Sequence, residues 1–369
     1  MSLNRGKQLT WERVIPDIAT KNEFLMHLLL ALSGLDDFTH QNPCNQDSRT
    51  VLFSKGSNES MSSTDVDSGS LHTIIEHHQQ GLRGLREALD GATEANVEVL
   101  ATGSMLLSAF AFASLRLKDF DPSHADGDGR PRVDWLRLVR GAASIIGHNW
   151  ASLIRGRLRK LFIFNRLDGV ELDFPVTSPT LIHSKRLSTF AEGARRAISN
   201  LRTFSDDLNL AITNAGHRAD SAHSPTCAQN ERDFLEQMFE DHERVIDIVE
   251  DKYIRILHVI HYFSRVDSDV SSDLDILADI EDTAVISWPH LLPQRFISSL
   301  DSYPCFGILE GKSFTILVHL YLILAVMENT WYIGTTIDRE VKKVNALVTT
   351  LGSPQLVELM QWPMEVVSS

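Results

Sequence analysis

The sequence is poor in cysteine, and this scarcity excludes two classes of protein. Its 369 residues include three cysteines, Cys44, Cys227 and Cys305, which lie far apart. No CxxC pair and no zinc-knuckle spacing occurs, which argues against a structural zinc site. An odd, sparse count also argues against a secreted domain built on disulfides. We therefore expect the chain in the cytoplasm, the nucleus or both.

Basic residues are also in deficit. The chain has 35 lysines and arginines against 49 aspartates and glutamates, so its formal net charge is −14. An acidic surface repels the phosphate backbones of DNA and RNA. We therefore expect no direct binding of nucleic acid by this chain.

Alternating strand patterns are nearly missing, and the one tempting run is LFIFN (161–165). Helical spacing dominates instead. Residues 230–263 place apolar side chains at i, i+3 and i+4 along one long amphipathic helix, with Asn230 as its expected cap. Further helices are expected at 71–89, 93–117, 134–148, 150–161, 186–212, 292–300, 313–330 and 335–350. Ser353 and Pro354 are expected to begin a last helix. The fold class is therefore all-α.

No linker separates parts of the chain that look independently foldable. The polar stretches near 55–70, 121–134 and 213–230 are rich in Ser, Gly, Asp or Asn, and we interpret them as flexible surface loops. No internal repeat is visible. We therefore expect a single multi-helix, bundle-like domain over 1–369.

An uninterrupted run of apolar residues long enough to cross a bilayer is also missing. The run from Thr315 to Met327 spans roughly 20 Å as a helix, short of the ~30 Å hydrocarbon core. Lys312 and Glu328 bracket it, and His319 lies inside it. We expect no membrane span. A helix that is apolar all round is surrounded by protein, or by protein and ligand, so the run predicts either a core helix or a pocket wall.

Motifs for catalysis, metal binding and nucleotide binding are not found. FGILEGKSF (306–314) falls short of a phosphate-binding loop, because its glycines enclose three residues instead of four and no strand precedes it. We interpret it as a turn, with Ser313 capping the next helix. His258 and His261 share a helix face, but no HExxH or Glu-x-x-His motif accompanies them, and GxSxG is absent. We expect no metal and no cofactor, and nothing here points directly to an enzyme.

Segments spread over nearly the whole chain form an ordered series of motifs. The opening WERVIPDIATKNEFLMHLLLALSGL combines a Trp, a Pro and an apolar helix. After it come HHQQGLRGLREAL, NVEVLATGSMLLSAFAF, WLRLVRGAASII, WPHLLPQRF, WYIG and a closing WP. This series resembles the regulatory domain of fungal binuclear zinc cluster transcription factors, and most of all the sterol uptake control protein group.

The resemblance implies an α-helical ligand-binding domain that encloses a hydrophobic pocket. In the sterol group the C-terminal part encloses ergosterol, and occupancy governs whether the factor stays in the cytosol or enters the nucleus to activate transcription. Carried over by position, the pocket residues are Leu317, Leu320, Tyr321, Leu324, Trp331, Tyr332 and Gly334. The family's cysteine-rich DNA-binding cluster is missing, so we expect an excised domain or a stand-alone derivative. The family's tryptophan pair is replaced by Trp331–Tyr332, so the ligand can differ.

Three functions stay open at this point. The first is a regulatory domain that binds a hydrophobic small molecule, such as a sterol, a terpenoid or a polyketide; a homodimer is a further expectation. The alternative is a stand-alone enzyme of fungal secondary metabolism that cyclises or rearranges a terpenoid or polyketide, with His319 and Glu328 as acid–base groups. The third is a helical scaffold that binds another regulator without a ligand.

Overall fold

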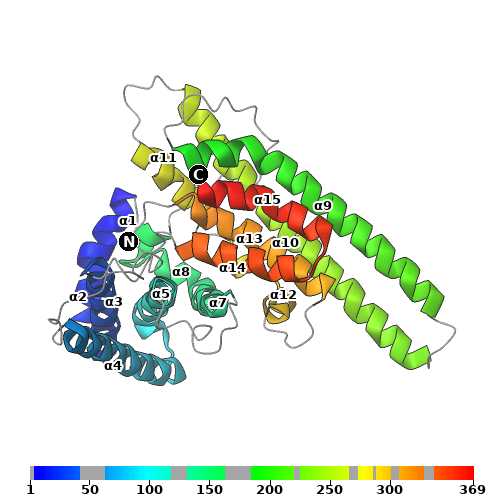
Figure 1. Cartoon of the computed structure of the whole chain (residues 1–369). Helices are drawn as coiled ribbons and strands as arrows, with labels where there is room; N and C mark the ends of the chain where they lie inside the picture. Colours follow the sequence, from blue (N-terminus) through cyan, green and yellow to red (C-terminus); the bar gives the residue numbers. More distant parts are fainter. Residues whose placement is uncertain are drawn as a thin grey trace, which may run out of the picture. The chain divides into compact units, whose positions relative to one another are not determined.

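The computed structural model shows an all-α protein, as the sequence predicts. It describes residues 4–41, 63–117, 131–162, 184–219, 225–265, 273–285, 288–300, 307–327 and 336–369, and these residues form helices and no strand (Figure 1). The chain divides into two compact units. Unit 1 comprises Met1–Phe164 with Asn329–Thr336, and unit 2 comprises Asn165–Glu328 with Ile337–Ser369. The single domain over 1–369 stays a prediction, and each unit is described by itself.

Unit 1 is built around α3, which packs against both α4 and α5, while α5 packs against α7. The described helical segments of unit 1, two of them 3₁₀ and one of them (η1) π-helical, are α1 (Arg5–Leu9), η1 (Thr10–Val14), α2 (Ile15–Ala19), α3 (Glu23–Gln41), α4 (Ser63–Asp90), η3 (Glu94–Asn96), α5 (Val97–Ser114), α7 (Asp134–His148), α8 (Trp150–Leu153) and η5 (Arg159–Leu161). The apolar stripe of α3, with Leu25, Leu28, Leu32 and Leu35 buried, forms the centre of its core.

Helices α3 and α4 approach closely at a glycine. A Cβ added to Gly84 of α4 would lie 2.4 Å from the Cβ of Phe24 on α3. That separation is shorter than any real contact between two carbon atoms, so any larger residue at position 84 would push the helices apart.

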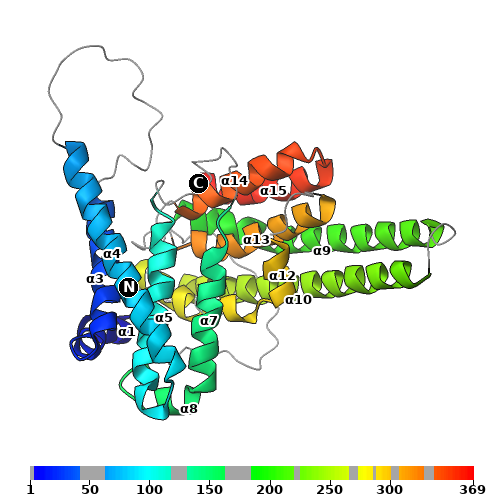
Figure 2. The ribbon, with the colours of Figure 1, turned by 90° about the horizontal axis from the view of Figure 1, so that it is seen from below.

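Unit 2 is built around α13, which packs against α10, α12, α15 and the π-helical segment η7. The described helical segments of unit 2 are α9 (Lys185–Ala219), α10 (Pro225–Arg265), α11 (Asp273–Ile280), η7 (Glu281–Val285), the 3₁₀ turn η8 (Pro289–Leu291), α12 (Gln294–Ser299), α13 (Ile308–Ala325), α14 (Thr336–Thr350) and α15 (Pro354–Ser368). Helices α9 and α10 run side by side as a long pair, and α15 packs against both α9 and α13 (Figure 2).

Two predicted segments differ from the structure in their helical extent. The helix expected at 150–161 stops at Leu153, because the backbone N–H groups of Arg155 and Gly156 bond to carbonyls three residues back and that of Arg157 donates to the carboxylate of Glu98. The loop expected near 213–230 is shorter, since α9 continues to Ala219 and α10 begins at Pro225. Pairing of the two long helices extends segments whose polar composition alone favours a loop.

The other predicted loops lie partly outside the described residues. Of the loop near 55–70, residues 63–70 belong to α4, and of the loop near 121–134, residues 131–134 lead into α7. The predicted cap Asn230 lies inside α10. Ser353 precedes α15 and Pro354 is its first residue, as predicted.

Two helices are long and apolar enough to cross a membrane by length and composition alone. They are Glu94–Ser114 and Ile308–Ala325, and both are mostly buried within the structure. This burial is consistent with the expected absence of a membrane span, because a core helix has the same composition.

Candidate functional site

Helix α13 carries the described part of the predicted ligand site. Its residues Gly311–Ala325 are buried without interruption. Leu317, Leu320 and Tyr321 are 0 % exposed, and Leu324 is 4 % exposed. Their i, i+3, i+4 and i+7 spacing places the four side chains on one face of the helix. The structure therefore brings these four predicted residues together on one buried apolar face.

The remaining predicted residues lie outside the described part of the chain. They are Trp331, Tyr332 and Gly334 of the pocket and Glu328 of the enzyme alternative. The described chain stops at Met327, just after α13, and resumes at Thr336, where α14 begins. The predicted pocket is therefore described only on its α13 side.

Three helices of unit 2 place aromatic rings around His319 of α13. Tyr253 comes from α10, Phe190 from α9 and Trp362 from α15, and we call these four residues the His319 cluster. The rings of His319 and Trp362 stack with centroids 6.0 Å apart and an interplanar angle of 23°. Phe190 meets Tyr253 edge-on at 4.8 Å, and the indole N–H of Trp362 donates to the carbonyl of Thr189 over 3.2 Å.

The hydrogen bonds of the cluster define the protonation of His319. The hydroxyl of Tyr253 lies 2.9 Å from the backbone carbonyl of His319 and 3.2 Å from its Nδ1. A carbonyl can only accept, so the hydroxyl donates to it, and Nδ1–H donates to the hydroxyl oxygen. Burial lowers the pKa of His319 to about 4, so the ring is neutral near pH 7. Its Nε2 is then a lone-pair acceptor.

This acceptor is buried and unsatisfied within the described structure. His319 is 1 % exposed, and no described residue hydrogen-bonds its Nε2. A buried polar atom without a partner is disfavoured by ~1–3 kcal/mol. Native structures rarely retain such an atom unless a water, an ion or a ligand satisfies it. Nδ1 of His242 on α10 is likewise buried without a described partner, but Nε2 of His319 is the nitrogen that lies beside the predicted pocket residues of α13.

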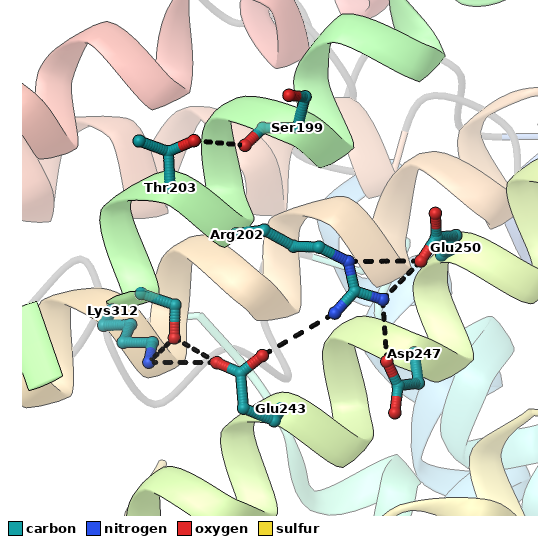
Figure 3. Close-up of polar contacts among 8 residues, drawn as sticks. Ser199, Arg202, Thr203, Glu243, Asp247, Glu250 and Lys312 are labelled. Carbon is teal, nitrogen blue, oxygen red and sulfur yellow. Dashed lines mark hydrogen bonds and ion pairs between the residues drawn. The ribbon is translucent and has the colours of Figure 1, made fainter. Parts of the chain in front are cut away.

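A second polar group lies at the beginning of α13. The ammonium of Lys312, which is fully buried, contacts the hydroxyl of Ser205 on α9 and lies 3.9 Å from Oε1 of Glu243 on α10 (Figure 3). It also lies 4.7 Å from the centre of the Phe239 ring. Burial lowers the pKa of Lys312 to about 8, against the opposing effect of Glu243 and Asp206.

The same carboxylate links Lys312 to a surface ion-pair group. Glu243 lies 3.6 Å from the guanidinium of Arg202, which also pairs with Asp247 at 2.7 Å and with Glu250 (Figure 3). We call these residues, with Lys312 and Ser205, the Lys312 network. It joins α9 to α10 and α13, and its cations already face carboxylates.

Most of the stretch FGILEGKSF (306–314) forms the beginning of α13, and its lysine belongs to the Lys312 network. Residues 308–314 are helical, and α13 begins after Gly307, whose N–H donates to the carboxylate of Glu310 over 2.9 Å. Ser313 therefore lies inside the helix, and the prediction that it caps the helix is wrong. Lys312 points to protein groups and is buried among them, so its role in the described structure is to hold α13 in place.

His242 of α10 forms a second buried polar contact with α13. Its Nε2 lies 2.8 Å from the hydroxyl of Ser313, and Ser299 of α12 donates to the same hydroxyl over 3.3 Å. Burial, with a further effect of Lys312, lowers the pKa of His242 to about 3. The ring is therefore neutral near pH 7, and its hydrogen bond joins α10 to α13.

A buried ion pair closes the other end of α13. The guanidinium of Arg186 on α9 lies 3.1 Å and 3.0 Å from the two carboxylate oxygens of Asp338 on α14. It also donates to the carbonyl of Ala325 over 3.1 Å. That carbonyl belongs to the last turn of α13, where no helical N–H can satisfy it. The pair thus fixes the helix end next to the segment that holds the undescribed pocket residues.

The sequence gives only partial signals for these partners. Tyr253 lies in the apolar stripe of α10, and a tyrosine buried there needs a partner for its hydroxyl. Trp362 belongs to the closing WP motif. Neither signal identifies His319 as the partner, because α10, α13 and α15 are far apart along the chain. Among the described residues, no group of three His, Cys, Asp or Glu is arranged to hold a metal ion.

Comparisons with protein-family models, with curated proteins and with solved structures give no match to this chain. The family resemblance therefore stays a prediction from sequence motifs.

Proposed function

We propose that unit 2 is a regulatory domain that binds a hydrophobic small molecule bearing a hydroxyl group, such as a sterol. The observation that carries this proposal is the acceptor Nε2 of His319. It lies in the buried, mostly apolar part of α13, and no described residue satisfies it. A ligand that buries mostly apolar surface and donates one hydrogen bond fits that environment.

The charge state of His319 determines which kind of polar group on a ligand it can bind. A neutral ring with its proton on Nδ1 presents only a lone pair at Nε2, so it accepts from a hydroxyl and gains nothing from a ketone or an ether. Apolar burial at ~25 cal/mol per Å² would supply most of the binding free energy. The hydrogen bond would orient the ligand. The motif series that resembles the sterol uptake control group independently supports a sterol-like molecule and a role in transcription regulation.

The pKa of His319 favours binding over acid–base catalysis. A general base works best when its pKa lies near the working pH. With a pKa of about 4, a neutral His319 is a weak base at pH 7. No observation in the described structure specifically favours the enzyme alternative, and turnover is one outcome of the test below.

The first experiment identifies what the purified protein retains. Organic extraction followed by mass spectrometry should release a hydroxylated apolar molecule at a ratio near one per chain. If a product accumulates when the protein is incubated with that molecule, the enzyme alternative is supported in place of the regulatory domain. A protein that retains no small molecule and also fails to bind ergosterol would refute the proposal. The hypothesis of a helical scaffold that binds another regulator would then remain.

A cycle of two ligands and two proteins then tests the hydrogen bond. The wild type and His319→Leu are titrated with ergosterol and with its 3-deoxy analogue. We expect the wild type to prefer ergosterol by about fivefold, since one net hydrogen bond contributes ~1 kcal/mol. His319→Leu should lose this preference or reverse it, because its side chain cannot accept and the hydroxyl of ergosterol would be buried without a partner. An unchanged preference in the variant would show that another group binds the hydroxyl.

Regulation requires that the ligand stabilise one state of the protein. A ligand at 100 times its Kd raises the free energy of unfolding by ~2.7 kcal/mol if it binds only the folded chain. We expect ergosterol to raise the midpoint of urea unfolding of the wild type, and to move a fluorescent fusion of the chain between cytoplasm and nucleus. If the protein binds ergosterol but its distribution between cytoplasm and nucleus does not change, the proposed binding stands and the proposed regulatory role is refuted.

A further inference from the structure

Unit 1 contains a cleft of about 860 Å³ that is rich in cations. One wall is formed by the end of α1 with η1 and α2, and the other by the turn between α8 and η5 with the start of α5. The basic residues that line it are Arg13, Arg155, Arg157, Arg159 and Lys160. Two acids, Asp17 and Glu98, also line it, which leaves an excess of three positive charges.

Both acids are engaged by one of these cations. Arg157 contacts Asp17 over 2.7 Å and Glu98 over 3.3 Å through its guanidinium. Glu98 also accepts from the backbone N–H of Arg157, and Lys21 lies 3.0 Å from Asp17. Lys21 and then Arg157 hold the pKa of the Asp17 carboxyl below its usual value. The acids therefore fix Arg157 in the cleft and leave the other cations uncompensated.

The turn that carries the cations is anchored in the core of unit 1. Leu153, Leu158 and Leu161 are 0 %, 0 % and 7 % exposed. The basic residues between them are exposed. A Cβ on Gly156 would lie 2.2 Å from Oε1 of Glu98, so the absence of a side chain lets that carboxylate reach the turn. The cations are thus held on a fixed backbone around the cleft.

The remaining cations lack acidic partners within the described structure. No described acid forms an ion pair with Arg13, Arg159 or Lys160, although the chain as a whole carries a net charge of −14. Like charges that gather around a recess repel one another, and a bound anion removes that repulsion. Guanidinium groups in particular match the geometry of phosphate oxygens.

We propose that this cleft binds a molecule that presents at least two phosphate groups close together. Its volume lies within the ~300–1,000 Å³ range of small-molecule sites, and cations line both walls. The same chemistry occurs in soluble polyphosphates and in the headgroups of phosphorylated lipids. A recess formed by short helices and a turn fits a small soluble polyphosphate better than it fits a long nucleic-acid duplex. The site belongs to unit 1 and does not depend on the function proposed for unit 2.

Calorimetric titration of the full chain with inorganic tripolyphosphate tests the proposal. We expect saturable binding that weakens at least about tenfold when sodium chloride rises from about 50 to about 500 mM, because the contacts are exposed to solvent. Arg159→Ala/Lys160→Ala should weaken binding at least about tenfold, and Arg13→Glu on the opposite wall should do the same. The matched control is Lys185→Ala/Lys342→Ala, which removes the same charge from exposed positions outside the cleft and should bind like the wild type.

Four results would overturn the assignment. These are no binding by the wild type, an equal loss in the control pair, no loss in Arg13→Glu, and tighter binding of a duplex DNA oligonucleotide than of tripolyphosphate. Sedimentation with phosphatidylcholine vesicles, with and without phosphatidylinositol bisphosphate, separates the two phosphate sources. Binding to tripolyphosphate alone supports the soluble source, and binding only to the phosphoinositide vesicles overturns it. Circular dichroism and the thermal midpoint show whether each exposed variant is folded.

Discussion

Gly193 of α9 provides a direct test of how the His319 cluster is packed. A Cβ built at this position would lie 1.9 Å from Nε1 and 2.3 Å from Cδ1 of the Trp362 indole. The indole lies against a bare backbone and cannot stay in place once position 193 carries a methyl group. Gly193→Ala is therefore a single-atom change that displaces one wall of the cluster.

Its effect on stability is the sum of three terms. Overpacking costs ~1–3 kcal/mol. Loss of the hydrogen bond from Trp362 to the Thr189 carbonyl costs ~0.5–1.5 kcal/mol. The helix propensity of Ala over Gly returns ~1 kcal/mol. We expect a net loss of about 2 kcal/mol, which corresponds to a fall of roughly 4–8 °C in Tm for a unit of this size.

Thermal and urea unfolding measure this loss, and two further variants control it. Gly141→Ala in α7 adds the same methyl group where no atom lies within 4 Å, so it should leave stability unchanged or raise it by up to ~1 kcal/mol. In a Trp362→Leu background the smaller side chain should make Gly193→Ala markedly less costly, because the two positions are in contact. The packing would be refuted if Gly193→Ala were as stable as the wild type, or if its cost were the same in both backgrounds.

Buried charge and buried histidine lead to three further expected outcomes. Because the pKa of His319 is lowered to about 4 and that of His242 to about 3, from 6.5, unit 2 should lose stability as the pH falls from 6.5 toward 4. The loss can reach ~1.4 kcal/mol per pH unit for each ring, and His319→Leu should remove the share of one ring in urea titrations while that of His242 remains. The lowered pKa of Lys312 means that the unfolded chain binds the extra proton between pH 8 and 10.5. Stability of the wild type relative to Lys312→Met should therefore rise across that window, and a constant difference would contradict it. Arg186→Leu should cost ~3–5 kcal/mol by leaving Asp338 buried without its cation, whereas Arg186→Leu/Asp338→Leu should recover most of that loss. Equal losses in the two variants would show that the unpaired carboxylate of Asp338 is not what destabilises Arg186→Leu.

The all-α fold follows from the sequence because helical spacing repeats along most of it. The buried character of α13 also follows, since an apolar run with no polar face has to be covered. The start of α13 differs from the prediction for a local reason. Gly307 and Glu310 cap the helix through a backbone N–H and a carboxylate, and these residues lie in a stretch whose glycines favour a turn.

The predicted pocket residues on α13 follow from spacing, but their neighbours do not. Helical periodicity places Leu317, Leu320, Tyr321 and Leu324 on one face, and the structure shows that face buried. Helical periodicity contains no information on which distant helix covers these four side chains. The contact between Tyr253 and His319 joins residues 66 positions apart. Such a pairing depends on how α10 and α13 cross, which is a property of the packed unit.

The Lys312 network shows the same limit for charged residues. In the sequence Lys312 follows a glycine near the start of an apolar run, a place where lysines are usually exposed. The structure buries it, because Ser205 and Glu243 approach from α9 and α10 and satisfy the ammonium. A buried lysine is tolerated only with such partners, and they are contributed by helices that the sequence around position 312 does not reveal.

The polar residues of α13 are best understood as fixing the register of an otherwise featureless helix. An apolar helix surrounded by apolar neighbours can rotate or slide with little change in buried area. Lys312 at one end and the carbonyl of Ala325 at the other each have a partner on α9, so the helix is held at both ends. His319 lies between them and is oriented by Tyr253. Its Nε2 is therefore held in a fixed position, so the binding of a hydroxyl group proposed here would carry a smaller entropic cost of ordering the site.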